Sequence, residues 1–467
     1  MFSRRVTRSL FVATALTGTA LGAAVATAAC STAAPRSSFD PPDASVDTGP
    51  DPVVDNDAFA PKGNCNGAPE TSITGTIYDP AGNTPLYNVI VYVPTKQVDD
   101  FPPSGVSCDR CGTVTSGAPK VTALTNAKGE FRLEGAPDGK DIPLVIQVGK
   151  WRRQVTIPKV ERCKENKLTD KDQTRLPKNK GEGDMPQIAL ATGSLDALEC
   201  LIRKFGIDDT EFTNETKAGK VHIYQGNTAG SPSPGGASPA PGGSTPSRVL
   251  WQNKTNLMKY DILMLSCEGT EPFNDNGADV SGGAAISRGA LYDYANAGGR
   301  IFGTHYNYYW FKYGPPGPDG NFRGTAAWTN TSSSGTTYNV DTSFPKGKDF
   351  ADWLVNVGAS TAPGKIELKS VSSDVGGVMP GTERWIYQGN STKYLSFNTP
   401  QGKPPAEQCG RAVFSDIHVA IDDQRGPVFP TECTTKTLSP QEQALEFLFF
   451  DLSSCVQDET KPPEPPK

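Results

Sequence analysis

The chain has 467 residues, of which 48 are glycine and 40 are proline, and this combined share exceeds the roughly 12 % of average globular usage. Together with a hydrophobic content of 36 %, it excludes a polytopic membrane protein and a fibrous or coiled-coil protein, and it argues against one continuous core. The net charge of −6 gives the chain no general attraction to nucleic acid or anionic lipid, so we expect no nucleic-acid partner.

Residues 1–29 have the pattern of a secretory signal peptide. Arg4, Arg5 and Arg8 precede an apolar run over residues 10–29. The run ends in Thr-Ala-Ala-Cys at Cys30, which resembles the lipobox of bacterial lipoproteins, in which the cysteine is acylated. The alternative is an ordinary cleaved signal followed by a chance cysteine. The resemblance implies an exported cell-envelope protein at the outer membrane or cell surface, held to the membrane only by a lipid on that cysteine.

Residues 30–68 are rich in Pro, Ala, Ser and Asp, and we predict a disordered spacer because so few apolar side chains cannot offset the entropy of folding. Residues 69–160 alternate short β-branched runs with turn residues, which predicts an antiparallel β-sandwich. The runs contain the motifs Ile73-x-Gly75-x-Ile77-x-Asp79, Val89-x-Val91 and Thr125-Asn126-x-x-Gly129-x-Phe131-x-Leu133.

These motifs resemble the carboxypeptidase regulatory-like domain, a transthyretin-like sandwich grouped with carbohydrate-binding-like folds. The resemblance implies an accessory module that accompanies another domain and has no chemistry of its own. Within this module, the aromatic and basic segment 150–153 is either a surface for a sugar or a strand edge packed under arginine stems.

Nine cysteines follow Cys30, and an oxidising compartment favours disulfides among them. Because nine is an odd number, at least one thiol stays free. Cys108 and Cys111 have the spacing of a redox motif, but they lack the strand-to-helix context that lowers a thiol pKa. A structural disulfide is therefore the favoured interpretation, and a redox role is the alternative. Cys409 and Cys433 are further disulfide candidates, and the sequence leaves the pairing open.

Residues 161–184 are predicted to be a polar linker, and residues 185–455 an α/β domain. In that domain short apolar runs alternate with helical periodicity, which predicts a flavodoxin-like doubly wound parallel sheet. Two loop insertions are expected, at 228–248, which is almost entirely Gly, Ser, Pro, Ala and Thr, and at 314–345. Residues 456–467 are rich in Pro, Lys and Glu and are predicted to be a disordered tail.

Polar side chains follow the predicted strands at the edge where an open α/β sheet binds its ligands, beyond the carboxyl ends. Two of the three histidines of the chain lie at such strand ends. The candidates are Cys267 and Glu268 after the third predicted strand, His305 and Tyr306 after the fourth, and Asp416 and His418 at the end of a late strand.

Three stretches of this region are Tyr-Asp-Ile-Leu-Met-Leu at 260–265, Gly-Gly-Arg-Ile-Phe-Gly-Thr-His at 298–305 and Gly-Arg-Ala-Val-Phe-Ser-Asp-Ile-His at 410–418. They resemble the class I glutamine amidotransferase-like superfold and, within it, the trehalose-utilisation-type branch, which also has histidine at the elbow after the fourth strand. Active amidotransferases have a cysteine nucleophile at that elbow and a later His-x-Glu. Here the elbow residue is His305 and the glutamate position is Ala420, which implies a chain without amidotransferase chemistry.

His305 and His418 remain the main candidates for chemistry. With Glu268 or Asp416 they match the ligands of zinc or another divalent ion, and histidines hydrogen-bonded to nearby carbonyls explain the pattern as well. We therefore predict no particular metal site, and the sequence identifies no cofactor. His222 lies within a strand and is expected to be a satisfied interior group.

An aromatic run follows the elbow and includes Tyr306, Tyr309 and Trp310. Such a run is either a platform that binds a sugar ring or the buried start of the following helix. The three residues are candidate ligand-binding residues under the first interpretation and core residues under the second.

Two functions remain open. The first is a non-catalytic, lipid-anchored envelope protein whose two domains bind a glycan, an envelope polymer or another surface ligand. The second is a hydrolase that acts on a carbohydrate-related substrate through His305 and His418, with or without a metal. Convergence of the two imidazoles and a carboxylate within hydrogen-bond or metal-ligand reach in an open cleft would favour the enzyme, and burial of either imidazole among apolar side chains would exclude it.

Overall fold

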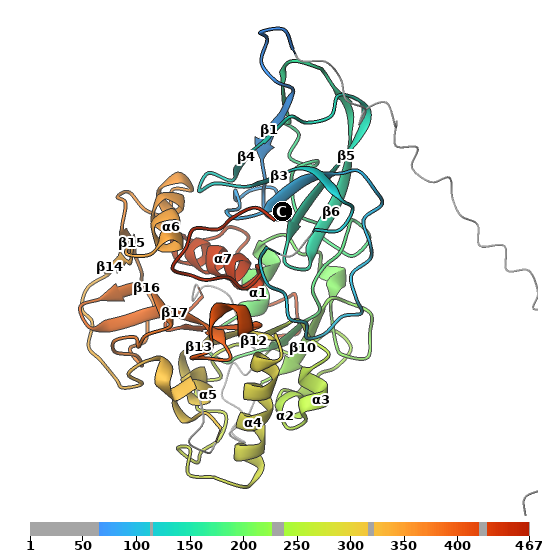
Figure 1. Cartoon of the computed structure of the whole chain (residues 1–467). Helices are drawn as coiled ribbons and strands as arrows, with labels where there is room; N and C mark the ends of the chain where they lie inside the picture. The colour runs from blue at the N-terminus through green and yellow to red at the C-terminus, as the bar shows by residue number, and fades with distance from the viewer. Residues whose placement is uncertain (1–64, 113–114, 227–237, 316–321, 420–426, 467) are drawn as a thin grey trace, which may run out of the picture. The chain divides into compact units, whose positions relative to one another are not determined.

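The computed structural model describes residues 65–112, 115–226, 238–315, 322–419 and 427–466 (Figure 1). The predicted signal peptide, Cys30 and nearly all of the predicted spacer lie outside the described residues. The regular structure is mostly β-sheet, arranged in several sheets with fewer helices. None of the helices in the described ranges is both long enough and apolar enough to span a bilayer.

Two small sheets form the N-terminal part. One has the strand order β4 (Glu130–Glu134), β1 (Ser72–Thr76), β7 (Glu165–Lys167), and the other β3 (Pro119–Leu124), β2 (Ile90–Pro94), β5 (Gly139–Val148), β6 (Trp151–Val160). Ile73, Val91 and Ile146 from the two sheets are fully buried in one apolar cluster, which explains why apolar residues alternate along these runs. The prediction of a linker over residues 161–184 is wrong in part, because β7 pairs with β1.

The large sheet has 11 strands and a parallel half and an antiparallel half. The parallel half has the order β11 (Thr245–Pro246), β10 (Val221–Gln225), β8 (Ile188–Ala191), β12 (Ile262–Leu265), β13 (Arg300–Thr304), β18 (Gly410–Ser415), and β9 (Phe212–Thr213) pairs with β10. The antiparallel half continues with β17 (Ser391–Thr399), β16 (Thr382–Gln388), β14 (Thr337–Val340) and β15 (Lys365–Glu367).

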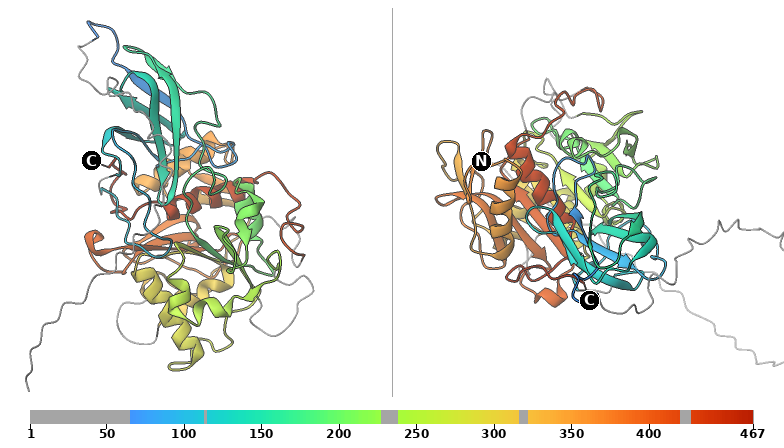
Figure 2. Two further views of the ribbon diagram at one scale, coloured as in Figure 1. Left: turned by 90° about the vertical axis from the view of Figure 1, so that its right-hand side faces the viewer. Right: turned by 90° about the horizontal axis from the view of Figure 1, so that it is seen from above.

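Helices cover both faces of the parallel half. Ile262 and Met264 of β12 share an apolar cluster with α1 (Leu198–Lys204) and α7 (Pro440–Ser453), whereas Leu263 and Leu265 share another with α4 (Gly283–Asn296). Figures 1 and 2 show α7 and α4 on opposite sides of this sheet. The other helices are α2 (Arg248–Trp251), α3 (Lys254–Leu257), α5 (Tyr308–Tyr313) and α6 (Pro345–Asn356), with 3-10 turns η2 (Asp209–Glu211), η3 (His305–Asn307), η4 (Phe322–Thr325) and η5 (Pro405–Glu407).

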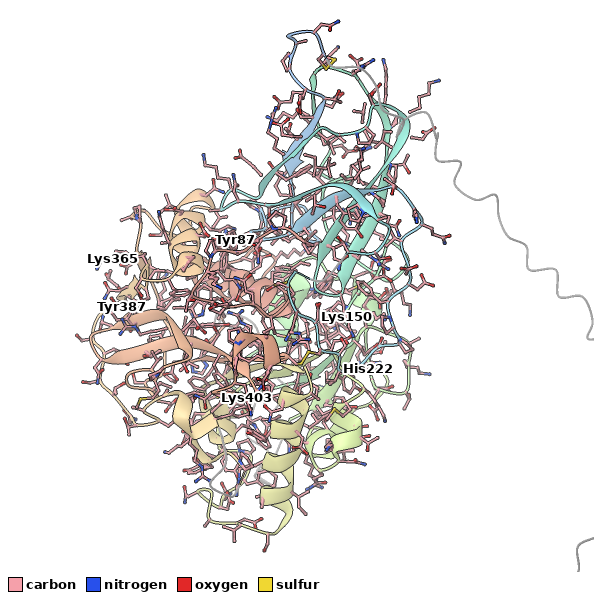
Figure 3. All side chains as sticks on the ribbon, in the orientation of Figure 1. Tyr87, Lys150, His222, Lys365, Tyr387 and Lys403 are labelled. Atoms are coloured by element: carbon pink, nitrogen blue, oxygen red, sulfur yellow. A yellow bond between two sulfur atoms is a disulfide. The ribbon has the colours of Figure 1, made fainter. Side chains whose placement is uncertain are left out.

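Side chains of the small sheets and of the α/β part share one core. The hydroxyl of Tyr87 donates to Asp349 at 2.6 Å, and its ring stacks on Phe447 of α7 with ring centroids 5.5 Å apart. The ammonium of Lys150 forms an ion pair with Asp261, the residue before β12. Figure 3 labels Tyr87 and Lys150. The composition argued against one continuous core, but the structure has one apolar cluster that contains side chains from both the small sheets and the α/β part.

Helix α7 begins with a capping box. The hydroxyl of Ser439 accepts from the backbone N–H of Glu442, and the Glu442 carboxylate accepts from the backbone N–H of Ser439. We expect Ser439→Ala to lower the free energy of unfolding by about 1 kcal/mol, because it leaves helix-end donors unsatisfied. Urea denaturation with the disulfides intact measures this. The exposed Ser281→Ala is the control, and equal effects of the two substitutions would contradict the prediction.

Eight cysteines form four disulfides, which confirms the prediction of disulfides. The pairs are Cys65–Cys163, Cys108–Cys409, Cys111–Cys455 and Cys200–Cys433. Cys108 pairs with Cys409, 301 positions further along the chain, and Cys111 pairs with Cys455, 344 positions further along. Because the two cysteines do not pair with each other, they do not form a redox dithiol pair. Cys267 is the free cysteine of the described residues, and it is buried.

The predicted disordered tail is ordered at its start. Val456 pairs in a β-bridge with Arg110, and Glu459 is 4 % exposed and accepts from Arg411. The prediction is wrong for these residues because it weighed local composition alone, whereas a buried cation supplies the partner that holds the segment.

Candidate functional site

Four neighbouring parallel strands deliver polar side chains to one edge of the large sheet. Asp196 follows β8, Cys267 follows β12, His305 follows β13 and His418 follows β18. Parallel strands end at the same edge, so residues far apart in the chain come together here. Gly193 permits the approach of two of these loops, because a Cβ at this position would lie 2.2 Å from the carbonyl oxygen of Cys267.

His418 is oriented by a buried carboxylate. Its Nδ1 lies 2.9 Å from Oδ1 of Asp196, whose side chain is completely buried and also accepts from the hydroxyl of Thr304 at 2.6 Å and the backbone N–H of Val419 at 3.1 Å. Burial raises the pKa of Asp196, but the imidazole of His418 and these donors outweigh it and hold the pKa below its ordinary value. The carboxylate is an acceptor only, so Nδ1 of His418 donates and Nε2 keeps its lone pair.

The Nε2 atom of His418 faces a hydroxyl group. The Nε2 atom of His418 lies 3.2 Å from Oγ of Ser372, a residue in the segment between β15 and β16. The three groups Asp196, His418 and Ser372 therefore form a chain of two hydrogen bonds in the order carboxylate, imidazole, hydroxyl. This is the order by which an imidazole takes a proton from an oxygen nucleophile.

His305 stands at the elbow after β13 with a φ of 43°, a left-handed backbone conformation that is uncommon for a residue with a side chain. Its Nδ1 lies 3.1 Å from Sγ of Cys267, and its Nε2 lies 3.6 Å from Oδ2 of Asp374. Burial raises the pKa of the Cys267 thiol and lowers the pKa of His305. The neutral thiol donates to Nδ1, which leaves the Nε2–H of His305 directed to the carboxylate.

The two imidazoles converge. The ring centroids of His305 and His418 are 4.9 Å apart and the rings are nearly perpendicular. One ligand atom each of Cys267, His305 and His418 lies within 4.8 Å of the others. The side chains of His305 and His418 keep 17 % and 12 % exposure, so neither imidazole is closed off among apolar side chains. The two imidazoles therefore lie within reach of each other.

A second buried carboxyl supports Asp374. Asp416 is completely buried, and its Oδ2 accepts from the backbone N–H of Asp374 at 2.9 Å. Burial and the neighbouring Asp374 raise the pKa of Asp416 well above its ordinary value. The ammonium of Lys393 donates to the hydroxyl of Ser373 at 2.7 Å. Asp416, predicted as a weak site candidate, therefore lies behind the site and supports the segment that carries Asp374.

The structure places the other predicted site residues elsewhere. Tyr309 and Trp310 are 0 % and 1 % exposed in an apolar cluster, so the sugar-platform interpretation is wrong for them and they are core residues at the start of α5. Tyr306 is partly exposed, and its ring centroid lies 4.2 Å from that of His305. Glu268 directly follows Cys267 on the loop after β12, and its carboxylate accepts from the hydroxyl of Ser247 at 3.2 Å.

His222 lies in β10 and forms hydrogen bonds to the hydroxyl of Tyr260 and the carbonyl of Lys217, as expected for a satisfied interior group. Figure 3 labels it near β10. It begins the strand rather than ending it, so it lies at the opposite edge of the sheet from the histidine pair. His222 is therefore a matched control for substitutions of His305 and His418.

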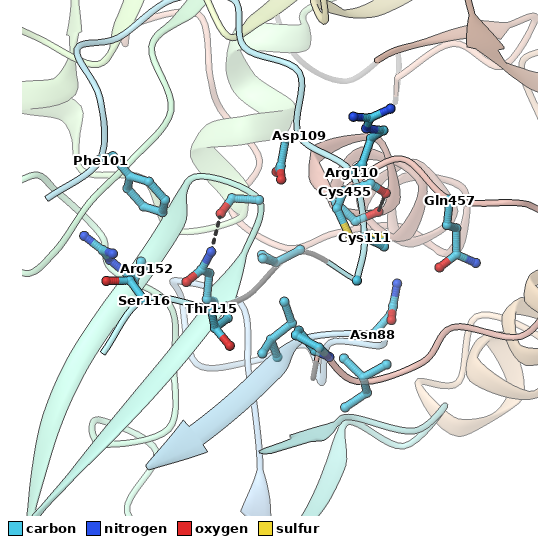
Figure 4. A pocket seen from close by; sticks show the side chains of 18 of the residues that line it. Asn88, Phe101, Asp109, Arg110, Cys111, Thr115, Ser116, Arg152, Cys455 and Gln457 are labelled. Atoms are coloured by element: carbon cyan, nitrogen blue, oxygen red, sulfur yellow. Dashed lines mark hydrogen bonds between the residues drawn. A yellow bond between two sulfur atoms is a disulfide. The ribbon is translucent and has the colours of Figure 1, made fainter. Parts of the chain in front are cut away.

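A cavity of about 320 Å³ lies beside the Cys111–Cys455 disulfide (Figure 4). Arg152 lines it, with its guanidinium 4.0 Å from the ring centroid of Phe101 and 2.8 Å from Asp184, while Trp151 is fully buried. The aromatic of segment 150–153 is thus buried against Phe449 and Phe450 of α7 rather than exposed as a surface for a sugar. The cavity lining among the described residues includes neither His305 nor His418.

The sequence interpretation missed Asp196, Ser372 and Asp374. Asp196 had a usable signal, because it lies five residues beyond the end of a predicted buried strand, where ligand-binding groups gather. Ser372 and Asp374 had none, since they belong to an irregular segment between β15 and β16 that only the antiparallel half of the sheet brings to this edge.

Comparisons with known proteins give no family. No protein-family model and no curated protein matches the chain. Two solved cohesin–X-dockerin complexes of Acetivibrio cellulolyticus share 13 % and 14 % identity, each over 32 % of this chain and 79 % of that chain, with a TM-score of 0.15. A cytoplasmic protein of Salmonella typhimurium shares 10 % identity over 59 % of this chain and 100 % of that chain, with a TM-score of 0.30.

Proposed function

We propose that this chain is an exported envelope protein whose α/β part is a hydrolase acting on a carbohydrate-related substrate through His305 and His418. The observation that carries the proposal is the convergence of two imidazoles at the carboxyl ends of adjacent parallel strands, one of them, His418, oriented by the buried carboxylate of Asp196. Hydrolysis needs an activated oxygen, and a carboxylate-held imidazole with a lone pair facing the substrate side supplies the activation. Amidotransfer is not part of the proposal, because His305 occupies the elbow that requires cysteine.

The finer fold assignment belongs to the same proposal. We infer a transthyretin-like β-sandwich of the carboxypeptidase regulatory-like type, followed by a flavodoxin-like doubly wound sheet of the glutamine amidotransferase-like, trehalose-utilisation type. The strand order β10, β8, β12, β13, β18 supports the second assignment, because numbering these strands along the chain gives 2-1-3-4-5, the flavodoxin-like order. The shared apolar cluster of the two small sheets supports the first.

The proposed location rests on the signal-like residues 1–29 and on Cys30, which the lipobox resemblance makes an acylation site. The four disulfides support an oxidising compartment, because such bonds do not persist in the reducing cytosol of most organisms. A lipid-anchored hydrolase of this kind would meet glycans or envelope polymers at the membrane surface.

The proposal is tested with the purified mature chain and chromogenic substrates of two kinds, nitrophenyl glycosides and acetylated sugars. We expect turnover of at least one kind, a loss of about 100-fold or more in His418→Ala, and unchanged turnover in His222→Gln. Circular dichroism confirms that each variant is folded. Absence of turnover in the wild type, or wild-type turnover in His418→Ala, would refute the hydrolase and favour the binding protein.

A further inference from the structure

The site has an arrangement that hydrolysis by imidazole alone does not require. Cys267, His305 and His418 come from three adjacent strand ends, and one ligand atom of each lies within 4.8 Å of the other two. A protein that needed only a general base would have no use for a thiol 3.1 Å from one of its imidazoles. Three nitrogen and sulfur donors on rigid strand ends match the three protein ligands of a catalytic zinc site.

The outer contacts of the histidines match the same kind of site. In metal centres a ligating histidine donates its second ring N–H to a carboxylate, a carbonyl or a water, and this fixes the tautomer and the ring orientation. Here each imidazole has a carboxylate on one nitrogen, Asp196 on His418 at 2.9 Å and Asp374 on His305 at 3.6 Å. The nitrogens left for a cation are Nε2 of His418 and Nδ1 of His305, and the second of these already lies beside Sγ of Cys267.

Cys267 differs from the other cysteines of the described residues. Eight of them are paired in disulfides, and Cys267 is a buried thiol. It cannot reach another cysteine at this edge, and its hydrogen-bond partner is an imidazole rather than an apolar side chain. Thiolate and imidazole ligands favour zinc over the hard cations magnesium and calcium, which select oxygen.

We propose that Cys267, His305 and His418 bind one zinc ion beside Ser372, whose Oγ lies 3.2 Å from Nε2 of His418. The inference rests on the proposed hydrolase for its role, and it names the group that activates the oxygen. A zinc-bound water has a pKa near 7, so it loses a proton and becomes a hydroxide at neutral pH. The hydroxide oxygen forms the new bond to the substrate, the bond to the leaving group breaks, and the leaving group takes up the proton that the water released.

This site also narrows the substrate class. Zinc polarises a carbonyl oxygen, whereas hydrolysis of a glycosidic bond ordinarily uses two carboxyl groups that flank the bond. Of the carboxylates here, Asp196 lies 2.9 Å from Nδ1 of His418, and Asp374 lies 3.6 Å from Nε2 of His305, so they do not flank a bond as a pair of catalytic carboxyl groups would. The substrate is therefore an ester or amide substituent of a carbohydrate rather than a linkage between sugars.

The test uses the purified mature chain, stripped with a chelator and titrated with Zn²⁺ or Co²⁺. We expect one ion per chain by elemental analysis and a thiolate-to-cobalt charge-transfer band in the near ultraviolet. Cys267→Ser should lose the band, His305→Gln and His418→Gln should weaken binding by about 100-fold or more, and His222→Gln should match the wild type. Circular dichroism verifies folding. Stoichiometric binding without the band, or unchanged binding in Cys267→Ser, would overturn the zinc site.

The outcomes separate this inference from the proposed function. Zinc binding without turnover of either substrate kind supports the metal site and refutes the hydrolase. Turnover that survives chelation and disappears in Ser372→Ala supports the hydrolase and overturns the metal site, because Ser372 would then be the nucleophile activated by His418. Turnover lost on chelation and restored by Zn²⁺ supports both.

Discussion

Asp196→Asn is expected to lower turnover by about 10- to 100-fold and to weaken zinc binding by a similar factor. Asp196 touches no substrate, so it is a positioning residue. Its Oδ1 lies 2.9 Å from Nδ1 of His418 and sets the tautomer in which Nε2 faces the hydroxyl of Ser372. An asparagine amide can present its nitrogen to that ring, which favours the wrong tautomer and removes the charge that stabilises an imidazolium.

The measurement is steady-state kinetics beside a cobalt titration. We expect kcat to fall while KM changes little, because the substitution alters the orientation of His418 and not the substrate contacts. Thr304→Val is the matched control: it removes one donor to Oδ2 of Asp196, at 2.6 Å, and leaves the contact with His418 in place. Its effect should be clearly smaller. Equal effects of the two variants, or a folded Asp196→Asn with wild-type kcat, would show that Asp196 serves stability alone.

Much of the parallel sheet was predictable because its central strands are short, buried and largely apolar. The sequence predicts strands over 188–191, 261–265 and 300–303, and the structure has β8 at Ile188–Ala191, β12 at Ile262–Leu265 and β13 at Arg300–Thr304. Since the carboxyl ends of parallel strands share an edge, His305 and His418 could be placed together without coordinates. Their separation of 4.9 Å between ring centroids required the structure.

What could not be predicted depends on long-range pairing. Ser372 and Asp374 reach the site only because β14 to β17 extend the sheet in antiparallel register, and nothing local in that segment indicates it. The disulfide partners of Cys108 and Cys111 lie hundreds of residues away, so spacing alone suggested the wrong relation between them. The sequence left two interpretations of Tyr309 and Trp310, a sugar platform and a buried helix start, because composition does not report which helix face is buried.

The C-terminal segment leads to the largest expected change in stability. Arg411 and Lys346 are completely buried side chains of β18 and α6, and both are positively charged. Asp451 contacts them at 2.8 Å each, and Glu459 contacts Arg411 at 2.6 Å and Lys346 at 3.1 Å. Burial raises the pKa of Asp451, but Arg411 and Lys346 outweigh it and hold the pKa below its ordinary value. Two cations are thus balanced by two carboxylates, one of them from the segment predicted to be disordered.

Glu459→Gln should therefore lower the free energy of unfolding by about 3–5 kcal/mol, because the two buried cations then share the single carboxylate of Asp451 and one positive charge is left unbalanced. Urea denaturation with intact disulfides measures the change, and Glu464→Gln, an exposed carboxylate of the same segment, is the control expected to change it by less than about 0.5 kcal/mol. Glu459→Asp keeps the negative charge on a side chain one methylene shorter. It should therefore lower the free energy of unfolding by less than Glu459→Gln does. If Glu459→Gln and Glu464→Gln behave alike, the segment packs against the sheet without the ion pairs contributing, and its order must come from the Cys111–Cys455 disulfide beside it.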